Sequence, residues 1–278
     1  NMDNSLSADE IKSRLSKYHL SLSMTDKFFI LMFDLYTITL TKDNNINYCC
    51  SNPQELGSKF KAVYESVFGK LLSTYDVLLE ITPGSNSFIG IITCTDLDMN
   101  MQVQILKRYC EKLIQIIYSK YNISISSYVS LPTTLANFHS SLQQVKSMEA
   151  NIIKCQNMVF LQQDYKEVNP EYTLPNLKLL DEYLQLEKRE DFVDYCHKYL
   201  TALSDYNRLN NKVVVSFQID ITQLIYSFLK EKGILAHKLI TGKTKDILLE
   251  LSTSSLESMI MYISYLVNSA LDYVAFSS

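Results

Sequence analysis

The chain has 278 residues, of which 47% are hydrophobic and 20% charged, a balance typical of a globular protein with two domains. Its 26 basic residues are outnumbered by 30 acidic ones, which argues against a basic surface for nucleic acid. Six cysteines occur without a CxxC pair, and the four histidines are scattered. We therefore expect reduced cysteines in a cytoplasmic protein, no metal site and no cofactor.

Three elements are predicted before residue 72. Residues 7–22 have the pattern of an amphipathic helix, with Ser7 and Glu10 at capping-box spacing. Residues 27–39 are apolar, β-branched or aromatic, which predicts a central strand interrupted by one acid, Asp34. Pro53 then stands in the first turn of a helix whose apolar positions continue to Leu71.

The stretch from residue 76 to residue 94 has the pattern of a β-hairpin. Two apolar runs, residues 77–81 and 88–92, flank the turn Thr82-Pro83-Gly84-Ser85-Asn86-Ser87. Proline presets one turn dihedral and glycine supplies a positive φ, so the turn has a physical basis. We expect this hairpin to lie at the centre of the first domain.

Four further elements complete the first half. They are a helix over residues 101–121, a strand over 123–129, a helix over 135–152 and a strand over 158–161. This order predicts an α/β (α+β) fold, a mixed sheet with packed helices. Two prolines mark a linker at residues 166–176. The expected division is an N-terminal helix (1–23), an α/β domain (24–165), the linker and an all-helical domain (177–278).

The second half reads as helical throughout. Helices are predicted over residues 177–187, 191–203, 213–232 and 255–276. Asp220 interrupts an apolar stretch of the third helix, and we expect it on the solvated side. The last helix has apolar residues in a 4,3 spacing, and its uncharged run is short against the ~20 residues of a membrane span. We interpret it as a core helix or a dimer helix, without membrane contact.

The order of strand, helix, hairpin, helix and strand resembles the GGDEF domain of diguanylate cyclases. The resemblance places Asp34 where that family has a metal-binding carboxylate, and residues 82–87 where it has its signature turn. It makes Asp34, Pro83, Gly84, Ser85 and Asn86 the positions of a vestigial cleft. Tyr36 replaces the second strand acid, and the turn holds no carboxylate. Because two-metal phosphoryl chemistry needs several carboxylates, we expect no enzymatic activity and no catalytic residue.

Taken whole, the chain is similar to the regulatory region of AraC-type transcription regulators of the YesN kind. There a degenerate GGDEF-like domain is followed by a helical connector and then by a helix-turn-helix domain. The resemblance implies a signalling role, with DNA contacted only through a domain outside this chain, which we interpret as a piece of a longer protein. The alternatives are a nucleotide-binding or cyclase-like enzyme, and a sensor whose small-molecule ligand occupies the cleft beside Asp34. Homodimer formation is left open.

Overall fold

The structure is a computed structural model that describes residues 25–36, 38–40, 46–48, 53–69, 71, 77–80, 86–95, 98–153, 157–167, 170–205, 208–236, 240 and 242–277. The expected helix over residues 7–22 and the turn residues Pro83, Gly84 and Ser85 lie outside the described residues. The chain divides into two compact units. The first contains Asn1–Thr37, Tyr48–Glu149 and Gln156–Tyr165, and the second contains Ile38–Asn47, Ala150–Cys155 and Lys166–Ser278. The described residues 38–40, 46–47 and 150–153 group with the second unit in this division, whereas the expected α/β domain covers residues 24–165.

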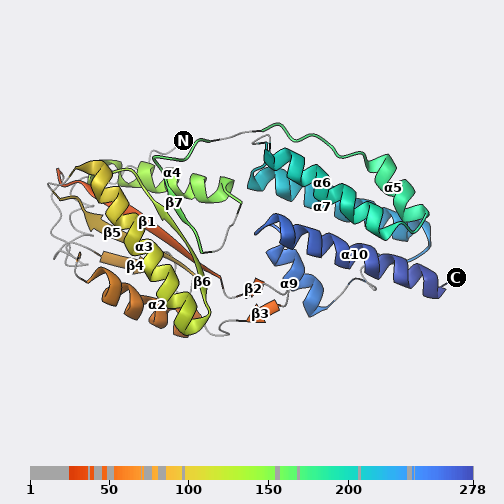
Figure 1. The fold of residues 1–278 in the computed structure, drawn as a ribbon, viewed down its shortest axis with the longest axis horizontal. Helices are drawn as coiled ribbons and strands as arrows, with labels where there is room; N and C mark the ends of the chain where they lie inside the picture. The colour runs from red at the N-terminus through yellow and green to blue at the C-terminus, as the bar shows by residue number, and fades with distance from the viewer. Residues whose placement is uncertain are drawn as a thin grey trace, which may run out of the picture. The chain divides into compact units, whose positions relative to one another are not determined.

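The first unit is built on a mixed sheet with the strand order β4-β5-β1-β6-β7 (Figure 1). The strands are β1 (Phe28–Tyr36), β4 (Val77–Glu80), β5 (Ser87–Thr93), β6 (Ser124–Val129) and β7 (Val159–Leu161). The central strand β1 is antiparallel to both β5 and β6, and β7 joins β6 in parallel. β4 pairs with β5 in antiparallel register, which confirms the predicted hairpin strands. The expectation that the hairpin lies at the centre was wrong, because β4 is the edge strand and β1 lies in the middle of the sheet.

Helices cover both faces of this sheet. α2 (Pro53–Phe68) and α3 (Met99–Tyr121) cover one face, and the short η1 (Leu135–Asn137) followed by α4 (Phe138–Asn151) covers the other. Successive side chains of a strand point to opposite faces. Accordingly Phe29, Leu31, Phe33 and Leu35 of β1 pack with α2 and α3, whereas Phe28 and Ile30 pack with η1 and α4. The predicted mixed sheet with packed helices is confirmed.

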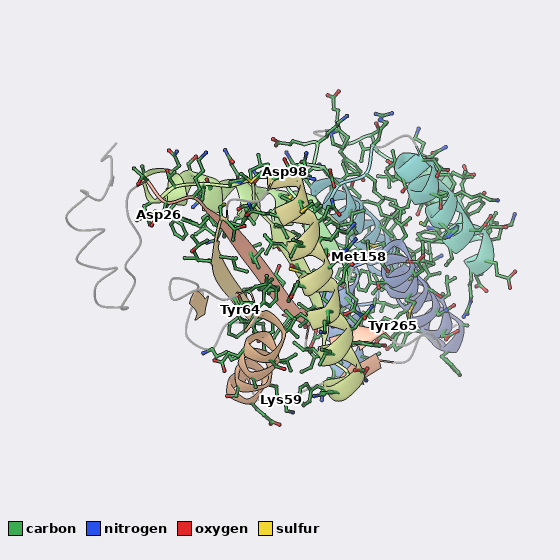
Figure 2. All side chains as sticks on the ribbon, turned by 60° about the vertical axis from the view of Figure 1, so that its left-hand side comes forward. Asp26, Lys59, Tyr64, Asp98, Met158 and Tyr265 are labelled. Atoms are coloured by element: carbon green, nitrogen blue, oxygen red, sulfur yellow. The ribbon has the colours of Figure 1, made fainter. Side chains whose placement is uncertain are left out.

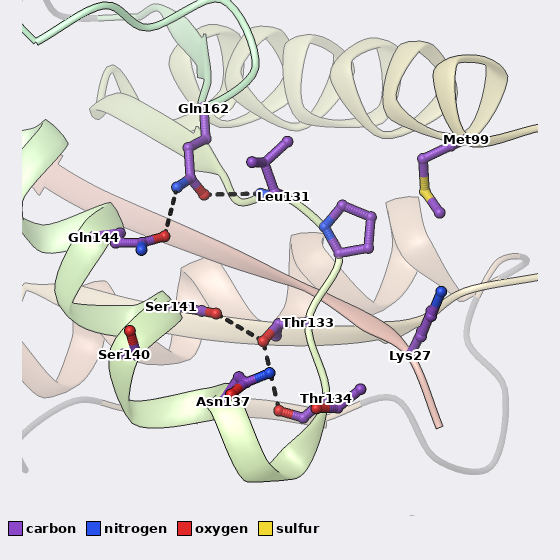
Figure 3. A pocket seen from close by; sticks show the side chains of 11 residues that line it. Lys27, Met99, Leu131, Thr133, Thr134, Asn137, Ser140, Ser141, Gln144 and Gln162 are labelled. Atoms are coloured by element: carbon purple, nitrogen blue, oxygen red, sulfur yellow. Dashed lines mark hydrogen bonds between the residues drawn. The ribbon is translucent and has the colours of Figure 1, made fainter. Parts of the chain in front are cut away.

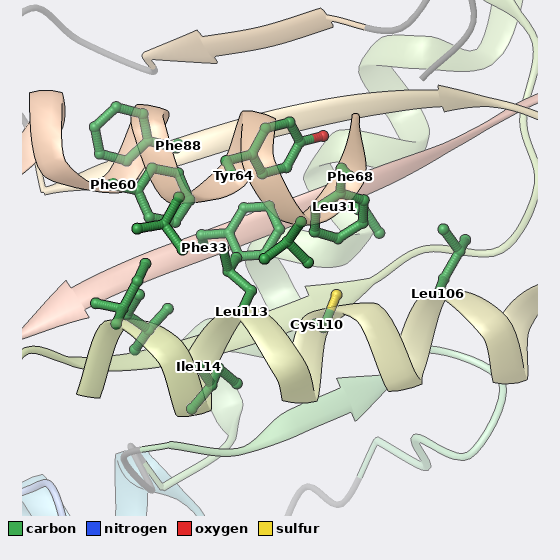
Figure 4. Packing of buried hydrophobic residues seen from close by; sticks show 14 of the residues in the cluster. Leu31, Phe33, Phe60, Tyr64, Phe68, Phe88, Leu106, Cys110, Leu113 and Ile114 are labelled. Carbon is green, nitrogen blue, oxygen red and sulfur yellow. The ribbon is translucent and has the colours of Figure 1, made fainter. Parts of the chain in front are cut away.

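The core between the sheet and the helices α2 and α3 is aromatic (Figure 4). The rings of Phe60 and Phe88 lie 4.6 Å apart between their centroids, and those of Tyr64 and Phe68 stack at the same separation. Tyr64 lies where α2 meets the sheet, as Figure 2 also shows. A Cβ atom at Gly90 of β5 would lie only 2.7 Å from the Tyr64 hydroxyl oxygen. Glycine is therefore required for the close approach of α2 to the sheet.

The described part of the second unit is mainly helical. Its longer helices are α5 (Leu177–Gln185), α6 (Arg189–Asp205), α7 (Asn211–Glu231), α9 (Lys243–Leu251) and α10 (Leu256–Ser277). The sequence predicted all of these except α9. Two short strands, β2 (Ile38–Leu40) and β3 (Ile46–Tyr48), pair with each other, so the strand expected over residues 27–39 is divided between two sheets.

Helix α10 presents a broad apolar face to the rest of its unit. Its most deeply buried side chains are Met259, Tyr262, Ile263, Leu266, Val267, Ala270 and Leu271. They share one cluster with apolar residues of α5, α6, α7 and α9, in keeping with packing inside the chain. By length and composition the stretch Leu256–Phe276 could also cross a membrane, and 39% of its most apolar part is buried. Core helices have the same properties, so the expected cytoplasmic location stays a prediction.

Candidate functional site

Asp34 lies near the end of β1, on the sheet face opposite α2 and α3. It stands between Ser87 of β5 and Ser126 of β6 in the strand register. The Ser87 hydroxyl donates a hydrogen bond of 2.7 Å to Oδ1 of Asp34. Asp34 is a partly buried acceptor that joins two neighbouring strands.

Two tyrosines share this polar end of the sheet. Tyr36 follows Asp34 by two residues and therefore lies on the same face, and Tyr128 comes from the neighbouring strand β6. The hydroxyl oxygens of both tyrosines are shielded from solvent. Burial raises the pKa of Tyr36 from 10.0 to about 12, and the charges of Asp34 and Glu149 add to this while hydrogen bonding with Ser126 opposes it. Burial also raises the pKa of Tyr128, so both groups stay neutral near pH 7.

The structure brings together part of the predicted vestigial cleft. The carbonyl oxygen of Asn86 accepts a hydrogen bond of 2.9 Å from the backbone N–H of Leu35, which places Asn86 beside the end of β1 that carries Asp34. Pro83, Gly84 and Ser85 lie outside the described residues, so their relation to Asp34 stays a prediction. Within the described ranges, no group of three His, Cys, Asp or Glu residues has the geometry to hold a metal ion.

A pocket of about 530 Å³ lies at the opposite end of β1 (Figure 3). Strands β5, β6 and β7 all end on this side of the sheet, because β5 and β6 run antiparallel to β1 and β7 runs parallel to β6. Lys27 precedes β1, and Gln162 follows β7. The other lining residues are Met99, Leu131, Pro132, Thr133, Thr134, Asn137, Ser140, Ser141 and Gln144. All eleven belong to the first unit.

Side-chain hydrogen bonds hold the walls of this pocket. Gln162 accepts a bond of 2.8 Å from the backbone N–H of Leu131 and donates one of 3.0 Å to Oε1 of Gln144. The Ser141 hydroxyl donates to Oγ1 of Thr133 over 2.7 Å. These bonds connect the segment after β6, helix α4 and the segment after β7, as Figure 3 shows. The sequence prediction missed this pocket, and its only local signal was the run of Ser, Thr, Asn and Gln between residues 133 and 144.

Asp220, the acid expected on the solvated side of α7, has a specific partner. Its carboxylate accepts a hydrogen bond from the hydroxyl of Tyr172, a residue of the segment that leads to α5. Asp220 is partly buried there. The contact gives this partly exposed acid a structural role in the helical unit.

Comparison with protein-family models, with curated proteins and with solved structures found no match to this chain. The order of the elements and the chemistry of the two polar sites are therefore the observations that bear on function. One site is the Asp34 cluster at the end of β1. The other is the pocket at its beginning.

Proposed function

We propose that this chain is a non-enzymatic signal-transmission and sensing region of an AraC-type transcription regulator. In this proposal the α/β unit is a degenerate GGDEF-like domain and the helical unit is the connector that follows it. The proposal is supported by the order of β1, α2, the β4–β5 hairpin, α3 and β6, because the resemblance to GGDEF domains rests on this order. A helical unit that follows in the chain agrees with the regulatory region of the YesN kind.

The surroundings of Asp34 carry the non-enzymatic part of the proposal. A carboxylate that holds a catalytic Mg²⁺ needs oxygen ligands from further acids around the ion. Here Oδ1 of Asp34 accepts a hydrogen bond from the Ser87 hydroxyl. The side chain two residues along the strand belongs to Tyr36, which is neutral and not a second acid. These surroundings suit a carboxylate that stabilises the sheet. We therefore assign Asp34 a structural role.

The alternative from another class is a nucleotide-binding or diguanylate-cyclase-like enzyme. Calorimetry with GTP and Mg²⁺, together with analysis of the products after incubation with GTP, separates the two. We expect neither tight nucleotide binding nor a cyclic dinucleotide. Turnover of GTP that disappears in the variant Asp34→Ala would show that Asp34 is catalytic and would refute the regulatory assignment.

The proposed role requires that DNA be contacted by a domain outside this chain. The net charge of this chain supports this requirement, because a formal charge of -4 at pH 7 disfavours binding to DNA phosphates. Binding to phosphates releases counterions and weakens steeply as salt rises. We expect no salt-dependent shift of duplex DNA by this chain in gel electrophoresis. A clear shift at 50 mM salt that is lost at about 200 mM salt would reveal a phosphate-contacting surface and contradict this part of the proposal.

A further inference from the structure

From the pocket at the beginning of β1 we infer a binding site for a small anionic polyol, a molecule of hexose-phosphate size with several hydroxyl groups and one phosphate or carboxylate. The site lies at the other end of β1 from Asp34 and involves none of the vestigial cleft residues. It does not depend on the proposed function, because a ligand can bind here whatever the chain transmits.

The size of the pocket and its walls suit a polar ligand of this kind. Its volume of about 530 Å³ falls within the range of about 300 to 1,000 Å³ that is common for small-molecule sites. Hydroxyl and amide side chains make up seven of the eleven lining residues: Thr133, Thr134, Asn137, Ser140, Ser141, Gln144 and Gln162. These groups both donate and accept hydrogen bonds, as the hydroxyls of a polyol require.

The charge of the lining selects an anion. Lys27 is its one ionisable residue, and none of the eleven lining side chains is acidic. A bond from an ammonium group to a phosphate or carboxylate is charge-assisted and stronger than a bond between neutral groups. The bond from Gln162 occupies Oε1 of Gln144, so the remaining polar group of that amide is a donor.

Preformed walls strengthen the inference. The two bonds of Gln162 connect the segment after β7 with the segment after β6 and with α4, and the Ser141–Thr133 bond closes the other side. A ligand that enters such a site does not have to order these segments, so little conformational entropy opposes binding. Polar side chains that converge on a pocket from several segments fix the orientation of a bound ligand and provide specificity.

The test is isothermal titration calorimetry of the whole chain with glucose 6-phosphate and with gluconate, which separate a phosphate from a carboxylate as the anionic group. Glucose and inorganic phosphate are the comparison probes. Glucose has the hydroxyl groups without an anionic group, and phosphate has the negative charge without the polyol. We expect one of the two anionic polyols to bind at least about tenfold more tightly than both comparison probes. Binding should weaken as salt is raised.

Two variants locate the site, each with a matched control. Lys27→Met removes the charge, and Ser140→Leu fills the pocket from an exposed position of α4. The controls Lys112→Met and Gln143→Leu change exposed positions of α3 and α4 outside the pocket lining. We expect affinity to fall about tenfold or more in Lys27→Met and to be lost in Ser140→Leu, with both controls unchanged.

The inference is overturned if neither anionic polyol binds more tightly than about 10 mM. It is also overturned if glucose or inorganic phosphate binds as tightly as the anionic polyols, or if both pocket variants bind like their controls. Circular dichroism of each variant shows whether the fold is retained, and the charge variant alone decides the matter if Ser140→Leu does not fold.

Discussion

The hydroxyl of Tyr172 donates a hydrogen bond of 2.6 Å to Oδ2 of Asp220, which joins the segment before α5 to the middle of α7. Burial and the Asp220 carboxylate both raise the pKa of Tyr172, so the phenol remains a donor at neutral pH. The contact spans 48 positions of sequence and fixes the segment on the helical unit.

Loss of this bond should destabilise the helical unit. We expect Tyr172→Phe to lower the free energy of unfolding by about 1–2 kcal/mol, because a partly buried carboxylate loses its donor. Urea unfolding followed by circular dichroism measures the change. Tyr118→Phe is the control, since Tyr118 is 48% exposed on α3 of the other unit. Equal unfolding midpoints for both variants would mean that the contact contributes nothing.

Alkaline pH should destabilise the α/β unit through Tyr36. Its pKa is raised from 10.0 to about 12, so the folded state favours the neutral phenol. The corresponding stability is fully present below pH 10 and is lost as the pH rises from 10 toward 12. Two pKa units correspond to a contribution of about 3 kcal/mol. We expect the melting temperature of the wild type to fall more steeply between pH 9 and pH 11.5 than that of Tyr36→Phe. If the melting temperatures of the wild type and of Tyr36→Phe fall equally over this pH range, the raised pKa of Tyr36 is contradicted.

Gly90 provides a test of the packing between α2 and the sheet. A Cβ atom at this position would lie 2.7 Å from the hydroxyl oxygen of Tyr64, and stacking with Phe68 prevents an easy movement of that ring. We expect Gly90→Ala to destabilise the unit by about 1–3 kcal/mol. Tyr64→Phe removes the clashing oxygen, so the double variant should lose less stability than the sum of the single variants. If the two single variants add up to the loss in the double variant, the clash with the Tyr64 hydroxyl is not the cause of the destabilisation.

The buried face of α10 should not tolerate charge. Ile263 and Val267 are both fully buried against neighbouring helices, so Asp at either position would bury an unpaired carboxylate. We expect Ile263→Asp and Val267→Asp each to lower stability by about 3 kcal/mol or more, and to remove any dimer that the wild type forms. Ala275→Asp, at an exposed position of the same helix, is the control. Thermal melting measures the stability, and sedimentation measures the dimer. An unchanged melting temperature and an unchanged mass in the buried variants would mean that α10 is an exposed tail.

The elements that the sequence predicted well are those with a long and regular hydrophobic pattern. Helices α2, α3, α7 and α10 repeat apolar residues at helical spacing over several turns, and the hairpin combined two apolar runs with turn chemistry. Helix α9 was missed because it has nine residues and follows Gly242, which left too short a pattern to recognise. The end of β1 was misplaced because its apolar run continues into β2, and periodicity does not mark a change of sheet.

The sites were less predictable because they depend on the strand register. Asp34 was identified as a notable acid, but its partner Ser87 is fixed only by the pairing of β1 with β5. The pocket is formed by residues that meet because β6 and β7 end at the side where β1 begins. No single stretch of sequence contains that information. Composition indicates polar segments, whereas the topology decides which of them meet.

The central place of β1 also has a consequence for synthesis on the ribosome. Leu31 needs Gly90 on one side and Val129 on the other, yet β1 is the first strand of the sheet to emerge. At roughly 5 to 20 residues per second, translation reaches Val129 about 5 to 20 seconds after Leu31. Until Gly90 emerges, this apolar nine-residue strand has neither neighbour of its final sheet, and until Val129 emerges it still lacks β6. A chaperone that binds nascent chains would have its greatest effect on this protein during that interval.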